Sequence, residues 1–140
     1  MKNRIETAVR LREIESAGTG WALWSDKAYE DELQNPDSKF FTLSNHGRPL
    51  DAFVFYRTVD TEAWIMQIAV EHKRQGRGSE LMRAFLAELK TLGFTEVGLE
   101  VASGNTSAVR LYEKFGFKKI GERKAYYRNG DSAWVLKLQL

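Results

Sequence analysis

The sequence contains no cysteine, so disulfide bonds, thiolate catalysis and zinc bound by cysteine are excluded. It also contains no apolar run near the ~20 residues that a membrane-spanning helix needs. The longest apolar run covers residues 52–56 and is short enough to be a strand. The amino-terminal residues include no apolar signal region. We therefore expect a cytoplasmic protein with no membrane partner.

Neither sign of charge dominates. The chain has 21 Lys and Arg against 19 Asp and Glu, a net charge of +2, which is too balanced to predict binding to nucleic acid. Two phosphate-binding patterns are missing as well: no G-x-x-x-x-G-K-[ST] occurs, and Leu81 stands where G-x-G-x-x-G needs its third glycine. His46 and His72 lie in polar segments without a His, Asp or Glu cluster at ligand spacing, so we predict no metal site.

The composition that is present fits an ordinary globular protein. The chain has 140 residues, 43% of them apolar and 29% charged, which suits one domain with a substantial core. Four Trp, five Tyr and eight Phe are a generous aromatic share and favour aromatic-lined concavities. We expect a single domain over residues 1–140.

The central stretch is predicted to be a strand, a tight basic turn and an amphipathic helix. Residues 64–70 are rich in β-branched and large apolar side chains, as in a buried strand. From Leu81 onward, apolar residues recur on one helical stripe. The connection between the two elements is Lys73-Arg74-Gln75-Gly76-Arg77-Gly78-Ser79.

This connection has the features of an anion site. Gly76 and Gly78 let the backbone turn tightly and approach a ligand closely. The first N–H groups of the following helix lack internal partners and carry partial positive charge, which favours phosphate. A polar connection with a flexible glycine pair explains the same residues equally well.

Hydrophobic periodicity and turn residues predict the remaining elements. Helices are expected over residues 7–17, 25–33 and 105–115, and strands over 39–44, 50–59, 95–101, 118–127 and 133–140. Ser25 and Asn105 are expected to cap the starts of their helices, and Gly93 and Gly116, each followed by Phe, to end the central and the last helix.

Because a long helix separates them, the strands at 64–70 and 95–101 are predicted to be parallel, with a right-handed crossover. The strands at 39–44 and 50–59 are expected to form a hairpin, and the turn at 60–61 leads into the strand at 64–70. The strands at 118–127 and 133–140 are expected to form a closing antiparallel pair. The fold class is α/β to α+β, a mixed sheet with helices on both faces.

Glu100 is a candidate proton acceptor. On its strand it shares one face with Gly98 and Ala102, while the apolar residues share the other. If helices cover both faces, the carboxylate is confined, loses solvation and rises in pKa, as a general base requires. For a lone glutamate, the more common alternative is a solvated residue near a strand end.

Tyr112 is the second candidate. It belongs to the inner stripe of the helix predicted over 105–115, with Ala108, Leu111 and Phe115. A tyrosine there can donate a proton, but a core tyrosine with a hydrogen-bonded hydroxyl is the commoner explanation.

Taken in order, these segments resemble the GNAT family of acetyl-CoA-dependent N-acetyltransferases. The resemblance runs from about residue 21 to the carboxyl terminus and includes IAV, KRQGRGS and LEVASGNTSAVRLYEKFGF. The pattern L-E-V-x-x-x-N-x-x-A-x-x-L-Y-x-x-x-G-F is its most specific block. Within the family, that block, WSDK at 24–27 and the tyrosine pair at 126–127 resemble the RimI type, the ribosomal-protein-alanine N-acetyltransferases.

The resemblance implies a role for each matching residue. Glu100 is the general base, directly or through water, and Tyr112 is the general acid that protonates the departing thiolate. Strand residues pair with the pantetheine arm, turn residues hold the pyrophosphate through N–H groups, and an asparagine contacts the arm from the other side. The implied cofactor-binding residues are Ile68, Ala69, Val70, Arg74, Gln75, Gly76, Arg77, Gly78, Ser79 and Asn105. Acetyl passes directly to the amine, because the chain has no cysteine and no evident Ser/His pair.

The implied acceptor is the N-terminal alanine of a small-subunit ribosomal protein. An α-ammonium has a pKa near ~8 and lysine near ~10.4, so the former loses its proton more readily at neutral pH. Trp24, Tyr126 and Tyr127 are candidates for the peptide pocket, with packing at the sheet margin as the alternative. A small amine or protein lysine as acceptor, and a coenzyme-A-binding module without turnover, remain open. We expect a monomer or weak dimer.

Two segments depart from the family pattern. The connection from Val70 to Gly76 is about two residues shorter than usual, which makes the roles of residues 68–70 less secure than those of 74–79. The amino-terminal segment is also compressed, so that only residues 3–7 are left to pair at the sheet edge.

Overall fold

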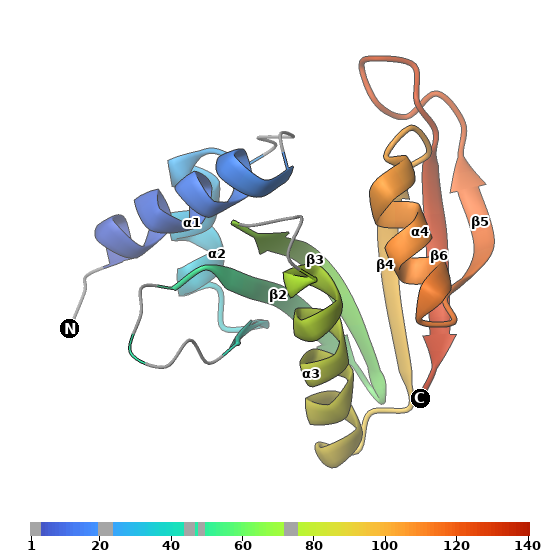
Figure 1. Cartoon of the computed structure of the whole chain (residues 1–140), viewed down its shortest axis with the longest axis horizontal. Coiled ribbons are helices and arrows are strands. Elements are labelled where there is room, and N and C mark those ends of the chain that lie inside the picture. The colour runs from blue at the N-terminus through green and yellow to red at the C-terminus, as the bar shows by residue number, and fades with distance from the viewer. Residues whose placement is uncertain (1–3, 20–23, 44–46, 48–49, 72–75) are drawn as a thin grey trace.

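The computed structural model describes residues 4–19, 24–43, 47, 50–71 and 76–140. Arg74, Gln75, His46, His72 and most of the connection at 45–49 lie outside this described part. The elements, shown in Figure 1, are α1 (Arg4–Thr19), α2 (Asp26–Gln34), β1 (Ser38–Thr42), β2 (Ala52–Val59), β3 (Glu62–Val70), α3 (Arg77–Thr91), β4 (Glu96–Ala102), α4 (Thr106–Lys114), β5 (Lys118–Arg123) and β6 (Ala133–Gln139).

The six strands form one mixed sheet in the order β1-β2-β3-β4-β6-β5. All neighbouring pairs are antiparallel except β3 and β4, which are parallel and connected through α3. This confirms the predicted hairpins, the parallel pair and the fold class. No helix in the described part of the chain is long and apolar enough to span a membrane.

The parallel strands pair over only part of their length. Their register runs from Glu62 opposite Glu96 to Ile65 opposite Leu99. Beyond these residues, β3 continues to Val70 while still paired with β2, and β4 continues along β6. The two strands therefore separate after Ile65 and Leu99, and Figure 1 shows them diverging.

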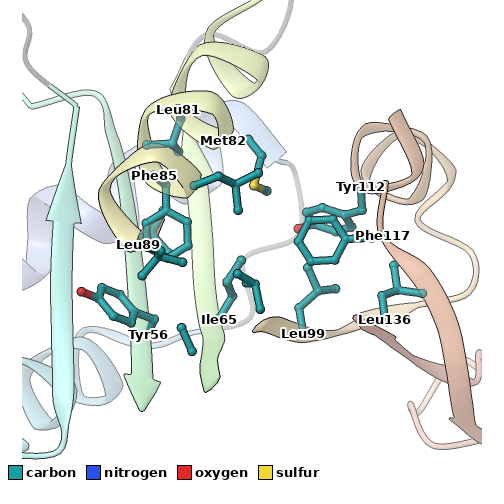
Figure 2. Close-up of a cluster of buried hydrophobic side chains, with 14 of the residues drawn as sticks. Tyr56, Ile65, Leu81, Met82, Phe85, Leu89, Leu99, Tyr112, Phe117 and Leu136 are labelled. Carbon is teal, nitrogen blue, oxygen red and sulfur yellow. The ribbon is translucent and has the colours of Figure 1, made fainter. Parts of the chain in front are cut away.

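Helices cover both faces of the sheet at β2 and β3. Alternate residues of β2 belong to different clusters: Val54 packs with α3, whereas Phe53 and Phe55 pack with α1 and α2. Figure 2 shows the first cluster, in which side chains from α3 face the strands and Tyr112 and Phe117 face them from the α4 side. The core thus continues under both α3 and α4.

Glycine ends α3 as the sequence predicts. Gly93 has a φ of 91°, and its N–H and that of Phe94 donate to the carbonyls of Lys90 and Leu89, both at 3.0 Å. These two bonds define a Schellman motif, which turns the chain back toward the core. Gly116 and Phe117 end α4 in the same way, and Phe117 is buried.

Two expected boundaries are wrong. Residues 4–7 belong to α1 and not to an edge strand, because the helix that buries Ala8, Leu11 and Ile14 already begins at Arg4. The strand predicted over 118–127 ends at Arg123. Ala125 has a φ of 49°, which lies in the left-handed region that strand residues do not adopt.

Candidate active site

A cavity of about 760 Å³ lies where β3 and β4 separate, a size typical of small-molecule sites. Five segments line most of it: residues 65–70 of β3, the start of α3, residues 99–102 of β4, the inner side of α4 and the connection at 127–129. A buried residue of α1, Glu15, completes the lining. Both sides of the separation therefore contribute to one cavity.

The start of α3 forms one end of the cavity. Gly76 is the N-cap, with φ 68° and ψ 10°, a left-handed conformation that glycine adopts without strain. Gly76, Gly78 and Ser79 all line the cavity. Because the first N–H groups of a helix lack partners in the helix and carry partial positive charge, this end suits an anion.

The side chain of Arg77 is not part of the described lining of the cavity. Its guanidinium donates to Asp51 at 2.8 Å and also bonds Glu80. Any contact between residue 77 and an anion in the cavity would therefore involve the backbone N–H, which is the predicted mode.

The edge of β3 that faces the cavity has no strand partner after Ile65 within the described residues. Ile68, Ala69 and Val70 all line the cavity, as predicted. An unpaired strand edge presents backbone N–H and C=O groups that can bond an extended amide-containing ligand. The N–H of Ile68 donates to Oε1 of Gln67 at 3.2 Å.

Glu100 lines the cavity but is not confined. It is exposed, and its carboxylate lies 3.3 Å from Nη2 of Arg123. The predicted loss of solvation is wrong, because Glu100 stays exposed on this face of β4, where the Trp64 ring covers Gly98. The alternative of a solvated glutamate describes its surroundings better. Its carboxylate nevertheless reaches the cavity, where a water molecule or an amine can approach it.

Tyr112 is buried, and burial raises the pKa of its hydroxyl above the usual value. Its ring contacts Phe117 with centroids 5.7 Å apart, and its hydroxyl makes no hydrogen bond within the described residues. Figure 2 shows the hydroxyl pointing away from α4 toward the side occupied by α3. Since Tyr112 also lines the cavity, its hydroxyl is a protonated donor facing the same space as Glu100.

Asn105 is the N-cap of α4, and its Oδ1 accepts from the N–H of Ala108 at 3.3 Å. This bond confirms the predicted cap. Asn105 also lines the cavity. Ser103 ties this region to the connection before β6, because its N–H donates to the carbonyl of Ser132 at 2.8 Å.

The three aromatic candidates separate into two groups. Tyr127 lines the cavity. The ring of Tyr126, which is exposed, lies edge-on to the ring of Tyr127, with the two centroids 5.2 Å apart. Trp24 packs against Tyr29 and Phe55, with centroids 5.0 and 6.0 Å away, and lies outside the lining of the cavity. Its surroundings match the packing alternative.

Sequence reasoning assigned no function to Glu15 or Gln67, both of which line the cavity. The signal for Glu15 was its position on the apolar stripe of a predicted helix, where a charged residue is unexpected. Gln67 gave a weaker signal, as a single polar residue inside an apolar strand. Arg128 and Asn129 were also missed, because their contribution depends on how the connection folds over the cavity.

Comparison with known proteins identifies the class. The model of the acetyltransferase (GNAT) family matches residues 8–117. The ribosomal protein bS18-alanine N-acetyltransferase of Escherichia coli K12 is 34% identical over 112 residues, 77% of this chain and 73% of the relative. That of Haemophilus ducreyi is 33% identical over 137 residues, 92% of each chain. The crystal structure of the ribosomal-protein-S18-alanine N-acetyltransferase from Escherichia coli matches with a TM-score of 0.82 and 29% identity, over 96% of this chain and 88% of that one.

The chain therefore belongs to the GNAT family of acetyltransferases. It is an N-acetyltransferase that uses acetyl-CoA as the acetyl donor.

Proposed function

We propose that acetyl-CoA binds in the cavity between β3 and β4 and that the acceptor is the N-terminal alanine of a small-subunit ribosomal protein. One observation supports this above all: the start of α3, the unpaired edge of β3, Glu100 and Tyr112 line the same cavity. The pyrophosphate would accept N–H bonds from residues 76–79, and the pantetheine amides would bond residues 68–70.

The same arrangement supplies the proton transfers. The amine nitrogen attacks the thioester carbonyl, the C–S bond breaks, and the nitrogen loses its proton toward Glu100, directly or through water. Tyr112 donates its proton to the departing thiolate. Since burial raises the pKa of Tyr112, it keeps that proton at neutral pH.

Two observations support an N-terminal alanine as the acceptor: the names of the relatives and the tyrosines near Glu100. Two relatives at 33–34% identity are named for the alanine of ribosomal protein bS18. Arg123 links Tyr126 to Glu100, because its guanidinium lies 5.5 Å from the Tyr126 ring and 3.3 Å from the Glu100 carboxylate. The end of a peptide would lie beside these residues and Tyr127. We propose that the chain acts as one domain, a monomer or weak dimer, in the cytoplasm, without a nucleic acid or membrane partner.

The test is acetyl transfer from acetyl-CoA to peptides that begin Ala-Arg, compared with polyamines, aminoglycosides and free lysine. Thioester consumption measures the rate, and intact mass locates the acetyl group. We expect transfer to the peptide α-amine, with none to a matched peptide whose N-terminus is blocked. Preferential labelling of a small amine or of a lysine side chain would overturn the acceptor assignment. Binding without thioester consumption would leave a coenzyme-A-binding module.

A further inference from the structure

Asp51 holds both described ends of the connection between β3 and α3. Its backbone carbonyl accepts from the N–H of Glu71, the residue directly after β3, at 2.8 Å. Its carboxylate accepts from Nη2 of Arg77, the first residue of α3, also at 2.8 Å. A single residue directly before β2 therefore links the end of the strand to the start of the helix.

The bond between Asp51 and Arg77 is shielded from water, because only 13% and 14% of the two side chains are exposed. Water screens such charges weakly, so the pair holds its geometry better than a surface pair does. Arg77 also bonds Glu80, whose side chain is 53% exposed and lies in the same helix. Of these two acids, Asp51 is the one that ties α3 to another segment of the chain.

The backbone beside Asp51 is itself held by α1. Arg10 donates to the carbonyl of Leu50, at 3.0 Å from Nε and 2.7 Å from Nη2. The same guanidinium bonds the carboxylate of Glu71 at 2.8 and 3.1 Å. The carboxylate of Asp51 consequently reaches α3 from a fixed backbone.

The charge of Asp51 is unfavourable for the site that it adjoins. The start of α3 offers partial positive charge to an anion, and Asp51 places a negative charge on the first residue of that helix. A negative charge close to an anion weakens its binding by repulsion. An effect of Asp51 on the anion through its charge and an effect through geometry therefore have opposite signs.

We propose that Asp51 is a positioning residue for acetyl-CoA, which acts through Arg77 on the backbone N–H groups of residues 76–79. In the proposed function, on which this inference rests, those groups bind the pyrophosphate. Hydrogen bonds weaken steeply with poor angles, so a fixed first turn of α3 keeps these N–H groups directed at the cavity. Arg77 thus contributes to the site although its side chain is outside the described lining.

The first test is Asp51→Asn, which keeps the size of the side chain and removes its charge. We expect the Kd for coenzyme A, measured by calorimetry, and the KM for acetyl-CoA to rise about threefold to tenfold, the loss of roughly one hydrogen bond. The kcat and the KM for the peptide should stay within about twofold. An unchanged or lower Kd would overturn the inference, because a lower Kd is the result expected from charge alone.

A shortened donor separates positioning of the phosphate site from general damage. S-acetylpantetheine carries the thioester and both amides of the donor but has no pyrophosphate. We expect wild type and Asp51→Asn to use it with kcat/KM values within about twofold. An equal loss with both donors would overturn the inference. If the wild-type protein uses both donors equally well, the proposed placement of the pyrophosphate fails instead.

Glu80→Gln is the matched control. Glu80 also bonds Arg77 and also loses its charge in the variant, but its contact stays within α3. The Kd for coenzyme A should therefore stay within about twofold of wild type. A rise equal to that of Asp51→Asn would overturn the inference, because the link to another segment would then be irrelevant.

Arg77→Met tests the same link in case Asp51→Asn does not fold, because its unbranched side chain fills the space of the arginine stem. The N–H of Glu80 donates to the carbonyl of Gly76 at 3.0 Å within the first turn of α3. Without coenzyme A, we expect the amides of residues 80–83 to exchange hydrogen about tenfold faster than in wild type. Wild-type exchange would overturn the inference, because a direct contact of Arg77 with the cofactor does not change the ligand-free helix.

Discussion

The two halves of the sheet, on either side of the separation between β3 and β4, are packed differently. In the described chain, α3 covers one face of β2 and β3 while α1 and α2 cover the other. The half formed by β4, β6 and β5 has α4 on one face, and Figure 1 shows α1 and α2 only on the side of the other half. The first half is a three-layered structure and the second is close to a two-layered one.

This difference decides what a glutamate can do in each half. Glu15, between α1 and β3, is 2% exposed and fixed by Gln67. Glu100, on the open face of β4, is exposed and contacts Arg123. Water screens the charge of a shielded carboxylate only weakly. A carboxylate in contact with water suits proton transfer, because water can carry the proton away.

The largest effect should come from the open half. Glu100→Gln removes the proton acceptor, and we expect acetyl transfer to fall ~10²-fold or more with acetyl-CoA binding intact. Steady-state kinetics and calorimetric binding measure the two effects. Glu96→Gln, on the same face of the same strand but outside the described lining of the cavity, should keep full turnover. Unchanged turnover in Glu100→Gln would remove this residue from the mechanism.

Tyr112→Phe should have the next largest effect. A thiol with a pKa of about 8.5 leaves with less assistance than an alkoxide, so we expect a loss on the order of tenfold to 10²-fold in kcat. Tyr56→Phe is the control from the three-layered half, since Tyr56 is also buried, and its pKa is also raised by burial. Wild-type kinetics for Tyr112→Phe across pH would assign Tyr112 to the core alone.

Both tyrosines should also affect stability in alkali. Because burial raises the pKa of Tyr56 and Tyr112 above the unfolded value of ~10, folding favours the protonated form. Their contribution is fully present below pH ~10 and is lost as pH rises through the folded pKa. Each Tyr→Phe variant should therefore lose less stability above pH ~10 than wild type, measured by urea unfolding at several pH values. Only Tyr112→Phe should also slow turnover.

The junction of the halves should respond to a single methyl group. A Cβ at Gly98 would lie 2.5 Å from Cζ3 of the Trp64 ring, so either the ring or the two strands must shift to admit it. We expect Gly98→Ala to cost about 1–3 kcal/mol of unfolding free energy. Gly121→Ala is the control, because a Cβ there meets no atom within 4 Å. Equal stability of the two variants in chemical denaturation would show that the Trp64 ring moves freely.

The smallest effects should come from the helix caps. Ser25 caps α2 with a bond of 3.1 Å to the N–H of Ala28, and Asn105 caps α4 with the equivalent bond to Ala108. Either residue changed to Ala should cost about 0.5–2 kcal/mol, measured by thermal unfolding. Only Asn105→Ala should also raise the KM for acetyl-CoA, because Asn105 lines the cavity. Equal acetyl-CoA kinetics in both variants would limit Asn105 to capping.

Much of the fold could be predicted because its signals are local. The caps at Ser25 and Asn105, the glycine endings of α3 and α4 and the parallel pair each depend on a few neighbouring residues, and the structure confirms them. The start of α1 was missed although the sequence carries a helix-start signal there, because Asn3 stands directly before Arg4 and Glu6 follows three residues later. The end of β5 was missed because the left-handed turn at Ala125 has neither Gly nor Asn to signal it.

For the site, the sequence predicted the face on which a residue lies but not what covers that face. Alternation along β4 correctly placed Glu100 opposite the apolar residues, but alternation cannot say whether a helix covers that face. Periodicity placed Glu15 on the inner stripe of α1 without showing that this stripe reaches the cavity.

The sequence by itself determined the elements, their capped ends and the side of each element that carries the apolar residues, because these depend on contacts within about one helical turn or one strand. The tertiary structure alone decided that β3 and β4 separate after four paired positions, that Glu100 stays open to water and that Glu15 is buried beside the same cavity. These features depend on where α1, α3 and α4 settle on the sheet, and that placement is set by contacts between residues far apart in the chain.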